Sequence, residues 1–87
     1  MKIEKVAKAG TLESNDIVIM VYPNENDTVE IELESIVMQQ FGTRIREVIQ
    51  ETLKSLGVTS VKVKAQDKGA LDYTIGARVE TAIKRAQ

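Results

Sequence analysis

Apolar and polar residues alternate in two stretches of the chain, and each stretch predicts a β-strand with one buried face. In residues 28–34, valine, isoleucine and leucine alternate with three glutamates, and in residues 58–65 valine and alanine alternate with two lysines. Because successive side chains of a strand point to opposite faces, the charged residues are expected on a solvent face. If the two strands are neighbours, the lysine row lies beside the glutamate row, and each pair favours that register by roughly 0.2 to 1 kcal/mol.

Two further strands are predicted nearer the N-terminus. Residues 17–22 (IVIMVY) are apolar at every position and rich in β-branched residues, which is typical of a central strand. Pro23 ends this strand because proline has no amide hydrogen to donate to a neighbouring strand. Residues 2–8 place three apolar residues among charged ones, an irregular alternation that predicts an edge strand.

A stripe of apolar residues at intervals of three and four predicts a long helix over residues 36–56. Ser35 is predicted to cap the start of this helix by accepting a hydrogen bond from an early backbone amide. Gly57 is predicted to end it in a left-handed conformation. The stripe comprises Met38, Phe41, Ile45, Val48, Ile49, Leu53 and Leu56.

The C-terminal part of the chain predicts a second helix. Asp67 is the candidate for its N-terminal cap, and Gly76 lies inside it at a cost of roughly 1 kcal/mol relative to alanine. Lys84 and Arg85 fall in the last turn, where positive charge is favourable beside the helix dipole. The face expected to meet the sheet comprises Leu71, Ile75, Val79, Ala82, Ile83 and Ala86.

The predicted order of elements is therefore strand, strand, strand, helix, strand, helix. This order predicts one α+β domain over residues 1–87, with a roughly four-stranded mixed sheet covered on one face by two helices. The long helix connects residues 28–34 to residues 58–65. Such a crossover is expected to be right-handed and to make the two strands parallel.

Composition narrows the classes of function. The 12 basic and 13 acidic residues nearly balance, and the aromatic residues are one Phe and two Tyr, so the chain lacks the charge and the stacking groups of a nucleic-acid-binding protein. Without cysteine and histidine, it lacks thiolate metal ligands, the commonest general base and the commonest metal ligand. The N-terminal residues show no signal-peptide pattern and no long apolar run, so we expect a cytoplasmic protein without a membrane segment.

A short polar turn, residues 10–16 (GTLESND), separates the first two predicted strands and holds Ser14. Serine, asparagine and aspartate are ordinary turn residues because their side chains bond to nearby backbone groups. The neighbouring carboxylates, Glu13 and Asp16, are weak bases that cannot activate a serine hydroxyl at neutral pH. Ser14 is therefore better suited to being modified by another enzyme than to acting as a nucleophile by itself.

Two motifs, residues 10–14 (GTLES) and residues 67–72 (DKGALD), resemble those of the acyl carrier protein (gamma subunit) of citrate lyase. The similarity runs over nearly the whole chain and includes residues 39–42 (QQFG). The resemblance implies that Ser14 carries 2'-(5''-phosphoribosyl)-3'-dephospho-CoA through a phosphodiester, after transfer by a dedicated prosthetic-group transferase. The chain departs from the family at Gly76, where an arginine is common.

The resemblance also implies the chemistry and the partners. The thiol of the coenzyme A-like arm would carry acetyl and citryl thioesters between an alpha subunit (acyl transferase) and a beta subunit (citryl lyase), while citrate is cleaved to oxaloacetate and acetate. The chain itself would be a non-catalytic carrier without a metal. If the family's usual arginine touches a partner or the phosphates of the arm, Arg78 alone would have to serve here.

Two other classes of function stay open on the residues alone. The first is a structural or assembly subunit with no prosthetic group, in which Ser14 is only a turn residue. The second is a small hydrolase or ligand-binding domain, which the lack of His, Cys and a Gly-rich phosphate loop disfavours. Residues 67–69 (DKG) also admit two interpretations, a helix cap or an anion site, and the cap is favoured because Asp67 would repel a phosphate.

Overall fold

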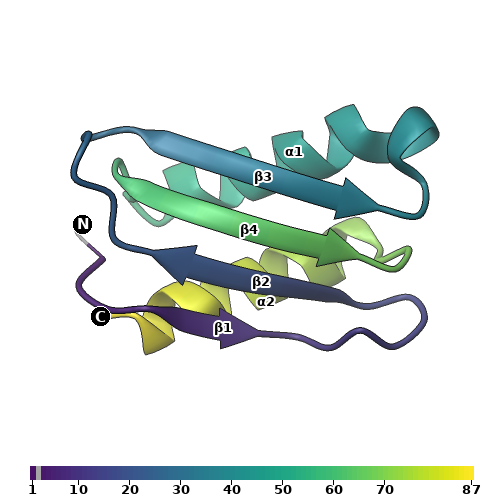
Figure 1. Ribbon diagram of the computed structural model, residues 1–87, viewed down its shortest axis with the longest axis horizontal. Helices are drawn as coiled ribbons and strands as arrows, with labels where there is room; N and C mark the ends of the chain where they lie inside the picture. The colour runs from purple at the N-terminus through teal and green to yellow at the C-terminus, as the bar shows by residue number, and fades with distance from the viewer. Residues whose placement is uncertain (2) are drawn as a thin grey trace.

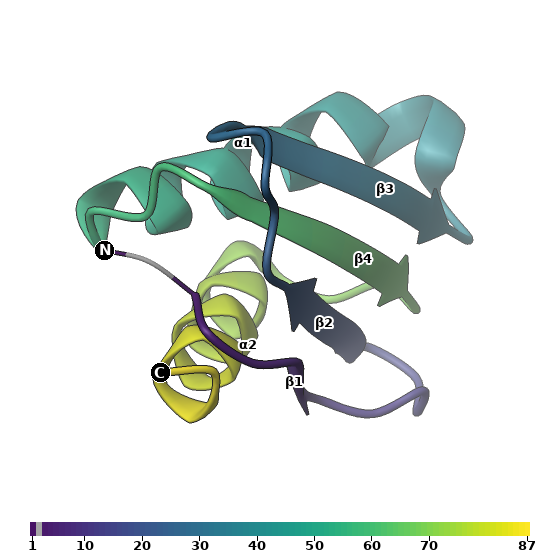
Figure 2. The ribbon, with the colours of Figure 1, turned by 60° about the vertical axis from the view of Figure 1, so that its left-hand side comes forward.

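The computed structural model describes residue 1 and residues 3–87, and its element order is the predicted one. The strands form a single sheet in the order β1-β2-β4-β3, and both helices lie on one side of it (Figure 1) (Figure 2). The predicted α+β class is confirmed. The elements are β1 (Ala7–Ala9), β2 (Ile17–Tyr22), β3 (Val29–Ser35), α1 (Met38–Ser55), β4 (Val61–Asp67) and α2 (Asp72–Arg85).

The sheet is mixed. Strand β2 runs antiparallel to both β1 and β4, as expected of the predicted central strand, and β3 runs parallel to β4. The register places Glu30 beside Lys62 and Glu32 beside Lys64, with Nζ–Oε2 distances of 4.0 and 3.9 Å. The predicted charge rows are therefore confirmed, although pairs this exposed contribute little stability.

The core lies between the sheet and the two helices. Alternate residues of each strand point toward the helices, and each helix presents one apolar face to the sheet. No helix among the described residues is long and apolar enough to cross a membrane. The largest fully buried apolar side chains are Ile17, Ile19, Val21, Ile49, Leu53, Val61, Val63, Ile75, Val79 and Ile83.

The prediction of an edge strand over residues 2–8 is wrong in its bounds. Strand β1 covers only Ala7–Ala9, and Lys2 lies outside the described residues. The amides of Glu4 and Lys5 donate to the carbonyl of Ala86 at 3.1 and 3.2 Å, while Ile3 is buried. This segment therefore pairs with the end of α2 instead of extending the sheet.

Neither helix has the predicted side-chain cap. Ser35 ends β3, where its hydroxyl accepts a hydrogen bond from the amide of Val37 at 3.0 Å and donates to Asp67 Oδ2 at 2.8 Å. Asp67 ends β4 and accepts bonds from the amides of Gly69 and Ala70 at 3.1 and 2.9 Å. Both side chains stabilise the loops before the helices, because each sits too early in the chain to reach a helical amide.

The predicted helix ends are confirmed. Gly57 has φ +75°, and the amides of Gly57 and Val58 donate to the carbonyls of Lys54 and Leu53 at 3.0 Å each, which is the pattern of a Schellman motif. Lys84 and Arg85 occupy the last turn of α2. The helix starts differ from the prediction: α1 begins at Met38, and α2 begins only at Asp72. The first apolar residues of both predicted stripes are exposed.

Candidate functional site

Ser14 lies in the loop between β1 and β2, at the end of the sheet where β3 and β4 finish and both helices begin (Figure 1). It is exposed. The amide of Asp16 donates to the carbonyl of Glu13 at 3.2 Å, so Ser14 and Asn15 form the centre of a tight turn. Asn15 has φ +65°, which asparagine tolerates better than most residues. The predicted exposed bend is confirmed.

The carboxylate of Asp16 anchors this turn to α2. Arg78 donates from Nε to Oδ1 at 3.0 Å and from a terminal nitrogen to Oδ2 at 2.9 Å. Thr11 Oγ1 and the amide of Ile17 donate to the same carboxylate, each at 2.7 Å. The hydrogen bonds from Arg78, more than those from Thr11 and Ile17, hold the pKa of Asp16 well below its usual range. Asp16 is therefore a structural anchor and an even weaker base than a free carboxylate.

The backbone of the second motif holds the other side of the turn. The amide of Asn15 donates to the carbonyl of Lys68 at 2.8 Å, and the amide of Lys68 donates to the carbonyl of Asp16 at 2.9 Å. These two bonds bring residues 10–16 and residues 67–72 together at one end of the molecule. The sequence singles out both motifs, but only the structure shows that they are neighbours.

Gly10, the first residue of the turn motif, is required by backbone geometry. Its φ is +94°, in the region that favours glycine. A Cβ atom at this position would lie 1.8 Å from the carbonyl oxygen of Ile17, which no side chain can accommodate. The glycine therefore lets the start of β2 pass directly against the loop that holds Ser14.

Exposed apolar side chains gather in the segments that meet at the Ser14 end. Among the described residues, eight large hydrophobic side chains are exposed, and six of them belong to the Ser14 loop, the β3–α1 junction or the first turns of the helices. The prediction that Leu71 faces the sheet is wrong, and Met38 and Phe41 are exposed although they belong to the predicted apolar stripe of α1. Met38, Phe41 and Leu71 are 39%, 53% and 61% exposed. The complete set is Leu12, Ile36, Met38, Phe41, Leu71 and Tyr73.

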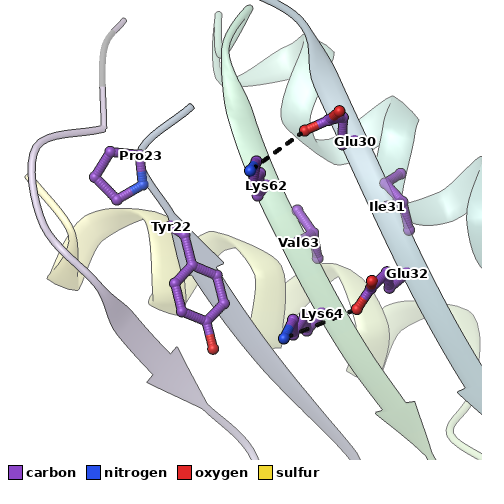
Figure 3. Close-up of a pocket in the computed structure, with 8 residues that line it drawn as sticks. All are labelled: Tyr22, Pro23, Glu30, Ile31, Glu32, Lys62, Val63 and Lys64. Atoms are coloured by element: carbon purple, nitrogen blue, oxygen red, sulfur yellow. Dashed lines mark ion pairs between the residues drawn. The ribbon is translucent and has the colours of Figure 1, made fainter. Parts of the chain in front are cut away.

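A hollow of about 700 Å³ lies beside Tyr22 on the face of the sheet that the helices do not cover. Figure 3 shows that the two lysine–glutamate pairs of β3 and β4 line it. Tyr22 ends β2, so about 17 Å of strand separates it from the residue that follows the Ser14 turn. Because its charges neutralise one another and it is remote from Ser14, we do not assign it to the function of the turn.

The role of Arg78 was missed by sequence reasoning. Its guanidinium donates two hydrogen bonds to Asp16. Arg78 therefore has a structural role, in place of the expected contact with a partner or a phosphate. A Cβ at Gly76 would lie 3.5 Å from Thr52 Oγ1 of α1, so a side chain there points toward α1. The sequence carries no local signal for this pair, because Asp16 lies in a polar turn and Arg78 lies 62 residues further along the chain.

Comparison with known proteins places the chain among characterised families. The family model described as malonate decarboxylase delta subunit (MdcD) matches residues 4–86. The citrate lyase acyl carrier protein of Halothermothrix orenii is 49% identical over 86 residues, which cover 99% of this chain and 90% of that protein. Its counterpart in Streptococcus mutans is 54% identical over 86 residues, covering 99% and 84%.

The chain belongs to the citrate lyase acyl carrier protein family. The resemblance seen in the two motifs is thereby confirmed, and membership of this family supports an acyl carrier role. A chain of a Pseudomonas malonate decarboxylase hetero-tetramer, crystallised with malonate, superposes with a TM-score of 0.80 at 16% identity, over 100% of this chain and 93% of that one. The two share a fold.

Proposed function

We propose that this chain is the acyl carrier subunit of a citrate lyase and that Ser14 is the attachment site of 2'-(5''-phosphoribosyl)-3'-dephospho-CoA. The observation that carries the proposal is an exposed serine on a turn that hydrogen bonds hold in place. These bonds join Arg78 to the Asp16 side chain and the backbone of Lys68 to Asn15 and Asp16. Identity of about half the residues with citrate lyase acyl carrier proteins supports the same assignment.

The residues around Ser14 fit a group added by another enzyme. Both oxygens of Asp16 already accept hydrogen bonds, and the other neighbouring carboxylate, Glu13, is too weak a base to deprotonate a serine hydroxyl at neutral pH. In the attachment step the Oγ–P bond forms and a phosphoanhydride P–O bond of an activated donor breaks, so the remaining phosphate groups of the donor leave as an inorganic anion. The hydroxyl proton passes to a base of the prosthetic-group transferase. A protruding turn gives that enzyme access to the hydroxyl.

The attached arm supplies a thiol, which this chain lacks, and with it the capacity to hold acyl groups as thioesters. The chain would then be non-catalytic and would work in the cytoplasm with the alpha subunit (acyl transferase) and the beta subunit (citryl lyase). Tethering would present the acyl group to both subunits at an effective concentration on the order of millimolar. The anchored turn would define where the arm begins.

The apolar side chains around Ser14 suit contact with these subunits. Aromatic and methionine side chains are enriched in the centres of protein interfaces, and exposed apolar groups that gather in one region mark interaction sites. Phe41, Met38 and Tyr73 lie at the same end of the molecule as the attachment turn. Docking through this end would bring the base of the arm close to the partner's active site.

The proposal is tested by the intact mass of the protein produced together with its prosthetic-group synthesis and transfer enzymes, followed by peptide mapping. We expect a mass increase of one phosphoribosyl-dephospho-CoA group on the peptide containing Ser14, and none in Ser14→Ala. Ser55→Ala, an exposed serine at the end of α1, is the matched control and should be loaded normally.

Ser14→Ala should also change the free energy of unfolding by no more than about 0.5 kcal/mol, because the side chain is exposed. A protein that stays unmodified, while the same enzymes load an authentic carrier, would favour the alternative of a structural subunit without a prosthetic group. Loading of Ser14→Ala would show that the group is attached elsewhere.

A further inference from the structure

Thr11 lies in the same loop as Ser14, and its side-chain hydroxyl both donates and accepts a hydrogen bond there. Oγ1 donates to Asp16 Oδ2 at 2.7 Å and accepts from the amide of Glu13 at 3.2 Å. A hydroxyl can do both at once, because it carries one hydrogen and two lone pairs. Thr11 therefore joins the carboxylate of Asp16 to the residue directly before Ser14.

The bond from Thr11 to Asp16 is the stronger of the two. Hydrogen bonds to an ionised carboxylate are shorter and roughly twice as strong as bonds between neutral groups. Asp16 is in turn held by two bonds from Arg78 of α2. Because this carboxylate is fixed, the Thr11 hydroxyl is fixed with it, and its remaining lone pairs point toward the amide of Glu13.

The backbone on the two sides of Ser14 is held in different ways. After the serine, the amide of Asn15 donates to the carbonyl of Lys68 at 2.8 Å, a bond between backbone groups alone. Before the serine, the amide of Glu13 donates to the side chain of Thr11. Removal of the Thr11 hydroxyl therefore releases the chain before Ser14 and leaves the bond after it in place.

The Thr11 hydroxyl contributes to the turn more than to the packing of the fold. Thr11 is exposed. Without its bond, Asp16 still accepts two hydrogen bonds from Arg78 and one from the amide of Ile17. An effect of Thr11 on the turn can therefore be separated from an effect on folding.

We propose that Thr11 is a positioning residue for the attachment of the prosthetic group. Its hydroxyl holds the backbone before Ser14, so that the serine Oγ is presented to the prosthetic-group transferase in one orientation. The inference rests on the proposed attachment at Ser14. Thr11 takes no part in the transfer of the phosphoryl group or of the proton, and it acts on the rate because group transfer depends strongly on the orientation of the reacting groups.

The test measures the initial rate at which the purified transferase loads the unmodified full-length protein, with the activated donor in excess and intact mass as the readout. Thr11→Val replaces the hydroxyl with a methyl group of similar size. We expect kcat for loading to fall by about tenfold or more, because misplacement by about 1 Å can cost about a hundredfold. The KM for the carrier should change by less than about twofold, since the surface around the turn is unchanged.

Two further variants separate the hydroxyl from the substitution itself. Thr11→Ser keeps the hydroxyl and should keep kcat within about threefold of wild type. Thr59→Val is the matched control and should change neither kcat nor KM, because Thr59 is an exposed threonine between α1 and β4, at the opposite end of the molecule (Figure 1). Circular dichroism at the assay temperature should show that every variant is folded.

A second measurement follows the hydrogen bond itself in the unmodified protein. NMR measures the exchange of the Glu13 amide with water. Wild type and Thr11→Ser should protect this amide, and Thr11→Val should lose the protection. The amide of Asn15, which bonds to the carbonyl of Lys68, should be equally protected in all three proteins.

The outcomes distinguish this inference from the proposed function. A wild-type protein that stays unmodified, while the same enzyme loads an authentic carrier, overturns the attachment at Ser14 and the role of Thr11 with it. If wild type is loaded and Thr11→Val is loaded with the same kcat, the positioning role alone is overturned, even where the variant is less stable. A rise in KM at unchanged kcat overturns it too, because Thr11 would then be a contact of the transferase.

Discussion

Asp16 and Arg78, 62 residues apart in the sequence, form a two-bond ion pair that joins the Ser14 turn to α2. The Asp16 side chain is 12% exposed and that of Arg78 is 39% exposed. The pair therefore lies at the boundary between core and surface, where a carboxylate keeps its charge only with strong partners. Its position explains how an exposed turn can hold a defined geometry.

Loss of the Asp16 charge should destabilise the protein. We expect Asp16→Asn to lower the free energy of unfolding by about 1 to 2 kcal/mol, because it removes charge-assisted hydrogen bonds from a partly exposed arginine. Urea unfolding monitored by circular dichroism would measure the change. Asp27→Asn is the matched control, since Asp27 is exposed and asparagine tolerates its φ of +52°. An equal effect of both substitutions would contradict an anchoring role for Asp16.

The same pair predicts how stability depends on pH. The hydrogen bonds from Arg78, with those from Thr11 and Ile17, lower the pKa of folded Asp16 below the ordinary value of 3.8. The unfolded state therefore binds the proton first, and the stabilisation is complete above about pH 5 and is lost progressively as the pH falls below the ordinary pKa. The difference in unfolding free energy between wild type and Asp16→Asn should shrink toward acid pH. A constant difference from pH 7 to pH 3 would contradict this.

Two glycine-to-alanine substitutions should have opposite effects. Gly76→Ala should stabilise the protein by about 0.5 to 1 kcal/mol, because Gly76 is helical and an added Cβ makes only an ordinary contact with Thr52. Gly10→Ala should destabilise it by at least about 1 to 2 kcal/mol, because alanine is strained at positive φ and would meet the carbonyl of Ile17. Melting temperatures measured side by side would test the pair. A stable Gly10→Ala variant that is loaded normally would show that the turn can rearrange.

Phe41 should matter for assembly and not for folding. It is 53% exposed at the Ser14 end, so Phe41→Ser should change the unfolding free energy by less than about 0.5 kcal/mol. If that end meets the partner subunits, the same change should weaken binding to them by at least about 1 kcal/mol, or roughly fivefold in Kd. Val6→Ser is the control, because Val6 is 56% exposed and lies directly before β1. Binding that is weakened equally by both variants would argue against docking through the Ser14 end.

Local sequence pattern was enough to predict most of the elements. Period-two alternation in residues 28–34 and 58–65 assigned the buried and solvent faces of β3 and β4, because side-chain direction in a strand depends only on the strand itself. The uniformly apolar residues 17–22 indicated a central strand, because such a run has no polar face to present to solvent. Gly57 marked the end of α1 because its conformation is a local property of the backbone.

The ends of elements depended on neighbours that the pattern does not contain. Ser35 and Asp67 have the chemistry of helix caps, but each bonds to loop amides and to the other. Phe41 and Leu71 continue the apolar stripes by spacing, yet they are exposed. Whether the first positions of a stripe are buried depends on how far the sheet extends beneath them, which is a property of the packed molecule.

The sequence by itself thus determined the element order, the faces of the sheet and the two motifs that include Ser14. Only the tertiary structure decided that Arg78 neutralises Asp16, that Lys68 lies beside the serine, and that exposed apolar residues gather around it. The periodicity of apolar residues extends over only a few neighbouring positions, so the sequence alone is enough to detect it. Contacts between residues 15 and 68 or 16 and 78 arise because packing of the helices on the sheet brings distant loops to one end.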